Sequence, residues 1–150
     1  MSRSLSILLP VFNAQSYLEH TVLSLLDVVP ELTSDFEVLI IDNGSSDDTA
    51  DTAQSLVARY PQLRLIQNQR RLGAQAAINA GLAVARGDVV FLREDGTRLD
   101  LAHIGSLWRR MGRRIGCIFR NSGIRNLPGR IPRFAARRRT RWITIRSTKR

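Results

Sequence analysis

Cysteine and long apolar runs are scarce in this sequence of 150 residues. Cys117 is the only cysteine, so the chain forms no internal disulfide and is compatible with a reducing compartment. The longest apolar run, Ile7 to Phe12, has six residues and contains Pro10, whereas a bilayer-spanning helix needs about 20. The amino terminus also lacks the pattern of a signal peptide. We therefore expect a cytoplasmic protein.

Acidic residues are missing from the last third of the chain. All 13 Asp and Glu residues lie within residues 1–100, together with 8 arginines, while residues 101–150 carry 15 positive charges and no acid. A segment of 50 residues with average composition holds about six acids. We predict that residues 112–150 form a poorly ordered, Arg-rich basic tail, because their composition buries too little apolar area to offset the ordering cost.

The charge of this basic tail is compatible with several origins and partners. It suits an anionic membrane surface, which would place the protein at the periphery of a membrane. It also suits nucleic acid, but no stripe or nucleic-acid motif organises the charges, so nucleic acid is the less favoured partner. A truncated gene or a shifted reading frame would produce an acid-free segment as well.

Apolar segments of strand type and helix type alternate through the first hundred residues. Strand-like runs occupy residues 5–9, 36–41, 63–66 and 89–92, and a helical pattern follows each of them. The helical stripe from Ala74 to Ala85 predicts a helix that Gly87 caps at its carboxyl end. The alternation predicts an α/β domain over residues 1–111, with a mostly parallel sheet in a three-layer α/β/α arrangement.

The stretch FEVLIIDNGSSDDT, residues 36–49, is the most informative part of the sequence. A strand of the kind buried on both faces ends at Asp42, and Gly44 permits a turn with positive φ. Residues 45–49 supply polar side chains for the start of a helix. Because open α/β sheets bind ligands at the carboxyl ends of their strands, Asp42 predicts a ligand site. A capped strand–turn–helix without a ligand is the alternative.

Four loops that follow the predicted strands form an ordered set, at residues 10–13 (PVFN), 42–47 (DNGSSD), 70–81 and 91–95 (FLRED). In order and spacing they resemble the nucleotide-binding half of family 2 glycosyltransferases, over about residues 4–100. The resemblance implies a truncated form of the A-type, Rossmann-like nucleotide-diphospho-sugar transferase fold. It also implies a nucleotide-diphosphate sugar of the uridine diphosphate type as ligand, and a role in polysaccharide or cell-wall biosynthesis.

The resemblance implies a nucleotide-binding role for each matching position. Pro10, Val11 and Phe12 would form a wall against the base, and Asp42 would accept hydrogen bonds from the base or ribose. Asn43 stands where a second acid is often found. The other nucleotide-binding residues that the resemblance implies are Arg70, Arg71, Gly73, Asn79 and Arg93.

Several of these residues also have a purely structural interpretation. Phe12 suits a plain core position, and Asn79 suits a polar helix surface. Arg70 and Arg71 suit a solvated loop, while Asp42 suits a turn. These alternatives remain open at the level of the sequence.

The metal motif departs from the family pattern. Family members carry Asp-x-Asp after the fourth strand, and these carboxylates suit Mg²⁺ or Mn²⁺. Here Arg93 replaces the first acid, and alternation along a strand turns Glu94 away from its neighbours. Asp95 keeps the position that usually touches the metal. The resemblance therefore implies a weak Mg²⁺ or Mn²⁺ site at Asp95, with Arg93 placed to contact the diphosphate directly.

No residue is assigned as the catalytic base. Inverting sugar transfer needs a general base, usually Asp or Glu, and this sequence has no acid after Asp100. His103, a lone helical histidine, suits a surface position. Three functions stay open: an active or decayed glycosyltransferase-like enzyme, a non-catalytic nucleotide-sugar binding module, and a basic-tail binder of nucleic acid or anionic membrane.

Overall fold

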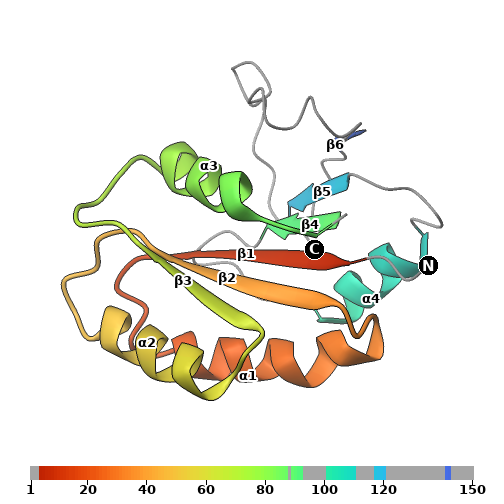
Figure 1. The fold of residues 1–150 in the computed structure, drawn as a ribbon, viewed down its shortest axis with the longest axis horizontal. Helices are drawn as coiled ribbons and strands as arrows, with labels where there is room; N and C mark the ends of the chain where they lie inside the picture. The colour runs from red at the N-terminus through yellow and green to blue at the C-terminus, as the bar shows by residue number, and fades with distance from the viewer. Residues whose placement is uncertain (1–3, 88, 93–100, 111–116, 121–140, 143–150) are drawn as a thin grey trace, which may run out of the picture.

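The computed structural model describes residues 4–87, 89–92, 101–110, 117–120 and 141–142 (Figure 1). Its strands are β1 (Leu5–Val11), β2 (Phe36–Asp42), β3 (Leu63–Gln67), β4 (Val89–Leu92), β5 (Cys117–Arg120) and β6 (Arg141–Trp142). Its helices are α1 (Leu18–Val28), the 3₁₀ turn η1 (Val29–Glu31), α2 (Thr49–Arg59), α3 (Ala74–Val84) and α4 (Leu101–Arg110).

The strands form one parallel sheet in the order β3-β2-β1-β4-β5-β6. The chain moves outward from β1 to β2 and β3, and then crosses to the other side of β1 to form β4. The strand order therefore reverses between β1 and β4, and such a reversal is where doubly wound sheets leave a crevice for ligands. Val11, Asp42 and Gln67 lie level with one another in the register, so β1, β2 and β3 end at the same edge.

Two apolar clusters hold the three layers together. α1 and α2 cover one face of the sheet, and α3 covers the other (Figure 1). Ile7, Leu9 and Ile40 point into the first cluster, while Leu8, Leu39 and Ile41 point into the second, as alternation along a strand requires. Trp108 of α4 packs against the first cluster. The predicted three-layer α/β/α fold is confirmed.

The helix boundaries have local causes. α1 buries Leu18, Thr21, Val22 and Leu25, which recur with the predicted helical spacing. α2 ends at Arg59, because Pro61 disfavours helical backbone in the residue before it. These features agree with the sequence pattern.

Two expectations for the third helix are wrong in detail. α3 ends at Val84, and its C-cap is Ala85 in an extended conformation, so Gly87 is not the cap. Gly87 is needed for a different reason: a Cβ atom there would lie 2.5 Å from the backbone nitrogen of Ser6 in β1. Ala74, predicted to lie on the apolar stripe, is exposed at the first position of the helix.

The segment predicted to be a basic tail contributes two short strands. β5 pairs with β4, and β6 pairs with β5. Residues 111–116, 121–140 and 143–150 lie outside the described residues, so the division into a domain over 1–111 and a tail over 112–150 remains a prediction. Within the residues that the structure describes, no helix has the length and apolar character needed to cross a membrane.

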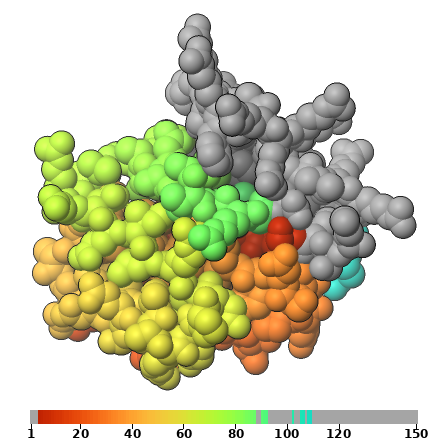
Figure 2. Space-filling model, in the orientation of Figure 1, coloured from red at the N-terminus to blue at the C-terminus, as the bar shows by residue number. Residues whose placement is uncertain are grey.

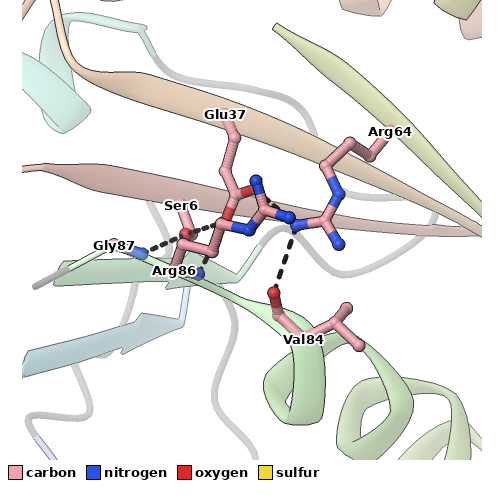
Figure 3. Close-up of polar contacts among 6 residues, drawn as sticks. All are labelled: Ser6, Glu37, Arg64, Val84, Arg86 and Gly87. Atoms are coloured by element: carbon pink, nitrogen blue, oxygen red, sulfur yellow. Dashed lines mark hydrogen bonds and ion pairs between the residues drawn. The ribbon is translucent and has the colours of Figure 1, made fainter.

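A polar cluster around the Glu37 carboxylate ties together the amino-terminal edge of the sheet (Figure 3). The Glu37 carboxylate on β2 accepts hydrogen bonds from the Ser6 hydroxyl (2.6 Å), the Arg86 backbone N–H (2.7 Å) and the Arg64 guanidinium (2.7 Å). Burial alone would raise the pKa of Glu37, but these bonds outweigh it and lower the pKa below its usual value of 4.5. Glu37 thus joins β1, β2, β3 and the segment before β4.

Candidate functional site

The loops after β1, β2 and β3 meet at the carboxyl edge of the sheet, at the left of Figure 1. They comprise residues 12–17, 43–48 and 68–73. Figure 2 shows the yellow-green loop after β3 protruding above the orange loop after β2. Side chains and backbone from the three loops are hydrogen-bonded to one another, so they form one connected structure.

Asp42 lies at the centre of this edge, in the last position of β2. Its side chain is buried, with a relative exposure of 1% for the residue. Oδ1 accepts hydrogen bonds from the backbone N–H of Ser45 (3.1 Å) and from the Ser45 hydroxyl (2.5 Å). One carboxylate oxygen therefore shapes the turn after β2, which is the structural role that the sequence left open for Asp42.

The first two loops are joined by their polar side chains. Asn13 has a positive φ of 49°, a left-handed conformation that Asn tolerates. Its side-chain oxygen accepts a hydrogen bond from the backbone N–H of Ser46 (2.9 Å), and the backbone N–H of Asn13 donates to the Ser45 hydroxyl (2.9 Å). The backbone N–H of Ala14 donates to the Thr49 hydroxyl (2.8 Å).

A second set of contacts closes the amino terminus of α2. Asp47 accepts hydrogen bonds from the backbone N–H of Thr49 (3.0 Å), the Thr49 hydroxyl and the backbone N–H of Gln15 (3.2 Å). The bond from the Thr49 hydroxyl is the main cause that lowers the pKa of the Asp47 carboxyl. Gln15 and Asp47 accept the backbone N–H groups of Asp48 and Thr49, so two donors at the start of α2 have protein acceptors.

The third loop is fastened to the end of β2 by Asn43. This residue is 8% exposed, and its Nδ2 donates to the carbonyl of Leu72 (2.8 Å). Its Oδ1 accepts from the backbone N–H of Leu72 (2.9 Å) and from Nδ2 of Asn68 (3.2 Å). The backbone N–H of Asn68 also donates to the carbonyl of Asp42 (2.9 Å). The end of β2 and the loop over residues 68–72 are therefore held in one geometry.

Gly44 allows the same loop to approach closely. Its φ is +74°, and a Cβ atom there would lie 2.4 Å from the carbonyl carbon of Arg70 and 2.5 Å from the backbone nitrogen of Arg71. Both the conformation and the space therefore require glycine. The predicted turn with positive φ at Gly44 is confirmed.

The loop places Arg71 over Phe12. The guanidinium carbon lies 4.1 Å from the centre of the Phe12 ring, within the range of a cation–π contact. Phe12 is partly exposed and Arg71 is exposed. An aromatic ring and a cation, 59 positions apart in the sequence, thus lie together at the carboxyl edge of the sheet.

The other predicted nucleotide-binding residues are less closely grouped. Val11 is buried at the end of β1, level with Asp42, and Pro10 precedes it in a partly exposed position. The carbonyl of Val11 accepts a hydrogen bond from the strand end of β2, at Asn43, so the backbone of Pro10 faces the opposite neighbour, β4. The described pairing of β1 with β4 ends at Leu8, two residues before Pro10. The missing N–H of Pro10 therefore breaks no bond in that ladder.

Two of the predicted residues belong to α3 and its amino-terminal cap. Gly73 is its N-cap, two positions after Arg71. Asn79 is exposed, and its side-chain oxygen accepts a hydrogen bond from Gln75 (2.9 Å). The structure thus gives Asn79 a partner on its own helix and places it apart from the contacts that surround Asp42.

The predicted metal position and its neighbour fall outside the described residues. Asp95 and Arg93 both belong to the segment over residues 93–100, which the structure does not describe. Among the residues that it does describe, no group of three or more His, Cys, Asp or Glu side chains could hold a metal ion.

Sequence reasoning missed the residues that join the loops. The sequence placed Asn13 and Asn68 in loops without a role, and it gave Asn43 the roles of a turn residue and of a substitute for an acid; Gln15 received no interpretation. A signal was present: all four are amide side chains next to predicted strand ends, and an amide can both donate and accept. Their partners lie 25 to 33 positions away, so only the folded chain identifies them.

Comparisons with known proteins agree with this architecture. The family model described as "Glycosyl transferase family 2" matches residues 6–114. Glycosyltransferase AglD of Haloferax volcanii is 29% identical over 144 residues, which is 95% of this chain and 22% of that protein. An uncharacterized glycosyltransferase of Haemophilus influenzae is 33% identical over 92 residues, 61% of this chain and 36% of that protein.

Among solved structures, the mannosyltransferase PcManGT from Pyrobaculum calidifontis, in complex with GDP-Man and Mn²⁺, superposes with a TM-score of 0.50. It is 23% identical, and the match covers 60% of this chain and 26% of PcManGT. The chain thus spans between 22% and 36% of the length of these three relatives. The family match covers most of the domain predicted from the sequence, and this chain belongs to glycosyltransferase family 2.

Proposed function

We propose that this chain binds the nucleotide part of a nucleotide-diphosphate sugar at the carboxyl edge of its sheet, as the donor-binding half of a family 2 glycosyltransferase. The observation that carries the proposal is the contact between Phe12 and Arg71 at the edge where β1 and β2 end level with each other at Val11 and Asp42. A ring to stack against a base, a carboxylate to accept its N–H groups and a cation for phosphate are what such a ligand requires.

The uridine diphosphate type is the donor that we propose first, as the sequence resemblance implies. PcManGT was solved in complex with GDP-Man, so a guanosine diphosphate donor is the alternative to test. Either base offers N–H donors for Asp42, and either offers a face for Phe12.

The proposal covers donor binding, and it assigns no catalytic residue. Sugar transfer requires a general base, and the sequence has no Asp or Glu after Asp100. A non-catalytic nucleotide-sugar module would show the same binding, so the two functions differ in turnover and not in affinity.

We propose weak use of a divalent cation. PcManGT is in complex with Mn²⁺, and Asp95 would supply the one matching carboxylate of this chain. Hard cations prefer several carboxylate and phosphate oxygens together, so a single acid with Arg93 in place of the other favours direct contact between Arg93 and the diphosphate.

We also propose an anionic membrane surface as a partner of the basic carboxyl-terminal segment. The 15 positive charges of residues 101–150, unopposed by any acid, support it. Co-sedimentation with vesicles that contain phosphatidylserine should then weaken as salt rises, whereas binding that is insensitive to salt would contradict an electrostatic contact.

Titration calorimetry on the full chain tests the donor-binding proposal. Uridine diphosphate and guanosine diphosphate are titrated separately, first with EDTA and then with Mn²⁺. We expect one of them to bind in EDTA, with an increase of less than about tenfold in affinity on adding Mn²⁺. Absence of binding for both nucleotides under both conditions would overturn the proposal, and an absolute Mn²⁺ requirement would overturn the proposed weak use of metal.

A further inference from the structure

Asn43 is a buried side chain that makes three of the described hydrogen bonds to the loop over residues 68–73. Its amide donates to the carbonyl of Leu72 and accepts from the N–H of Leu72 and from Asn68. Beside it, Gly44 leaves just enough room for the backbone of Arg70 and Arg71. Two adjacent residues at the end of β2 therefore determine where this loop lies.

We infer that Asn43 is a positioning residue for nucleotide binding, and that it acts by holding Arg71 over the ring of Phe12. Asn43 is hydrogen-bonded to both the carbonyl and the N–H of Leu72, which is the next residue after Arg71. Arg71 in turn lies 4.1 Å from the Phe12 ring centre. A displacement of the Leu72 backbone would move the guanidinium away from the ring.

In this chain the contacts of residue 43 use both the donor and the acceptor of an amide. A carboxylate at residue 43 would still accept from the N–H of Leu72, but its second oxygen would face the carbonyl oxygen of Leu72, where the amide now donates at 2.8 Å. Two buried acceptors at that distance repel one another. Asn43→Asp is nearly isosteric, so it changes the position of the loop without creating a cavity.

This inference rests on the proposed function, because a wall made of Phe12 and Arg71 matters only if a nucleotide binds there. When the side chains of Phe12 and Arg71 are already ordered in the free protein, nucleotide binding has a smaller entropic cost. Loss of the Asn43 contacts should therefore be felt as weaker nucleotide binding, and only while Arg71 is present.

A double-mutant cycle tests the inference. The affinity of uridine diphosphate or guanosine diphosphate, whichever the wild type binds, is measured for Asn43→Asp, Arg71→Ala and the double variant. We expect Asn43→Asp to weaken binding about tenfold when Arg71 is present. In the Arg71→Ala background, the same substitution should weaken binding less than about twofold. Thermal unfolding should show the same loss of stability in both backgrounds.

Ser6→Ala is the matched control for stability. Ser6 is buried and hydrogen-bonded to Glu37 and Gly87 at the opposite edge of the sheet. Its removal should lower the melting temperature and leave nucleotide affinity unchanged. If Asn43→Asp weakens binding equally in both backgrounds, or does not weaken it, the positioning role is wrong.

A readout without nucleotide separates this inference from the proposed function. In the free protein, the ring current of Phe12 should shift the Nε–H NMR signal of Arg71. We expect that shift to disappear in Asn43→Asp and to persist in Ser6→Ala. A shift that persists in Asn43→Asp would overturn the inference by itself, whereas a wild type that binds neither nucleotide would overturn the proposed function.

Discussion

At the scale of single residues, Asp42 combines a structural contact with a proposed functional one. Its Oδ1 holds the turn through Ser45, and the proposal gives its carboxylate the N–H groups of a nucleotide base. The two roles can be separated by mutation, because the Ser45 hydroxyl serves the turn and is not assigned to the ligand.

We predict that Asp42→Asn weakens nucleoside diphosphate binding about tenfold, because a buried carboxylate acceptor is replaced by an amide. Ser45→Ala should lower the free energy of unfolding by about 1 kcal/mol and change the affinity by less than about threefold. Calorimetry and chemical denaturation measure the two quantities. If the two variants lose affinity only in proportion to lost stability, Asp42 is a turn former alone.

The lowered pKa of Glu37 leads us to predict that the free energy of unfolding depends on pH. Its folded-state pKa lies below the usual 4.5, so the folded state favours the ionised form. The resulting stabilisation is present above pH 4.5 and is lost as the pH falls from 4.5 through the lowered pKa. Glu37→Gln should cost about 1–2 kcal/mol at pH 7 and flatten this acid limb of the stability curve.

Glu19→Gln provides the control for that experiment. Glu19 also pairs with an arginine, Arg59, but its side chain is 54% exposed, against 13% for Glu37. An exposed pair contributes about 0–1 kcal/mol. An equal effect of the two substitutions on the acid limb, measured by denaturation between pH 3 and 7, would contradict the role given to the cluster around Glu37.

At the scale of elements, the contact between the β2–α2 turn and the β3–α3 loop depends on Gly44. We predict that Gly44→Ala lowers the free energy of unfolding by about 2–4 kcal/mol, because alanine would be strained at φ +74° and would meet the backbone of Arg70 and Arg71.

Gly73→Ala is the matched change on the same surface. At Gly73, φ is −57° and a Cβ atom would have no neighbour within 4 Å, so the cost should stay within about 1 kcal/mol. Denaturant unfolding of both variants compares them directly. Similar losses would mean that the close approach at Gly44 does not limit the fold.

The regular elements could be predicted because their signals are local. Continuous apolar runs marked β1 and β2, and helical spacing marked the buried face of α1. Gly87 was misassigned because a glycine after a helix is usually a cap, whereas this one is required by the closeness of Ser6 on β1. Such tertiary approach leaves no trace in the local sequence.

The site could be predicted only in part, for a related reason. Asp42 and Phe12 follow strand-like runs, and parallel strands bring such residues to one edge. The pairing of Asn43 with Leu72, and of Arg71 with Phe12, depends on how far each loop reaches after its strand. Loop conformation is not periodic, so pattern reasoning named some of the residues and missed their contacts.

At the scale of the whole molecule, the boundary between domain and tail can be tested by proteolysis. The predicted division places a trypsin-sensitive segment after Gly112, where 13 Arg or Lys residues occur. We expect limited trypsin to leave a resistant product that ends near residue 111. Protection that extends to Arg120, with loss of stability on truncation at 111, would instead assign β5 and its pairing with β4 to the folded core.

The central claim is that a nucleoside diphosphate binds at the carboxyl edge of the sheet, and amide NMR of the full chain tests it most directly. On titration with uridine diphosphate or guanosine diphosphate, we predict shifts in the backbone signals of Phe12, Gly44 and Arg71. The signals of Ser6 and Gly87, at the amino-terminal edge, should stay in place. Shifts confined to the amino-terminal edge, or no shifts with either nucleotide, would contradict the account.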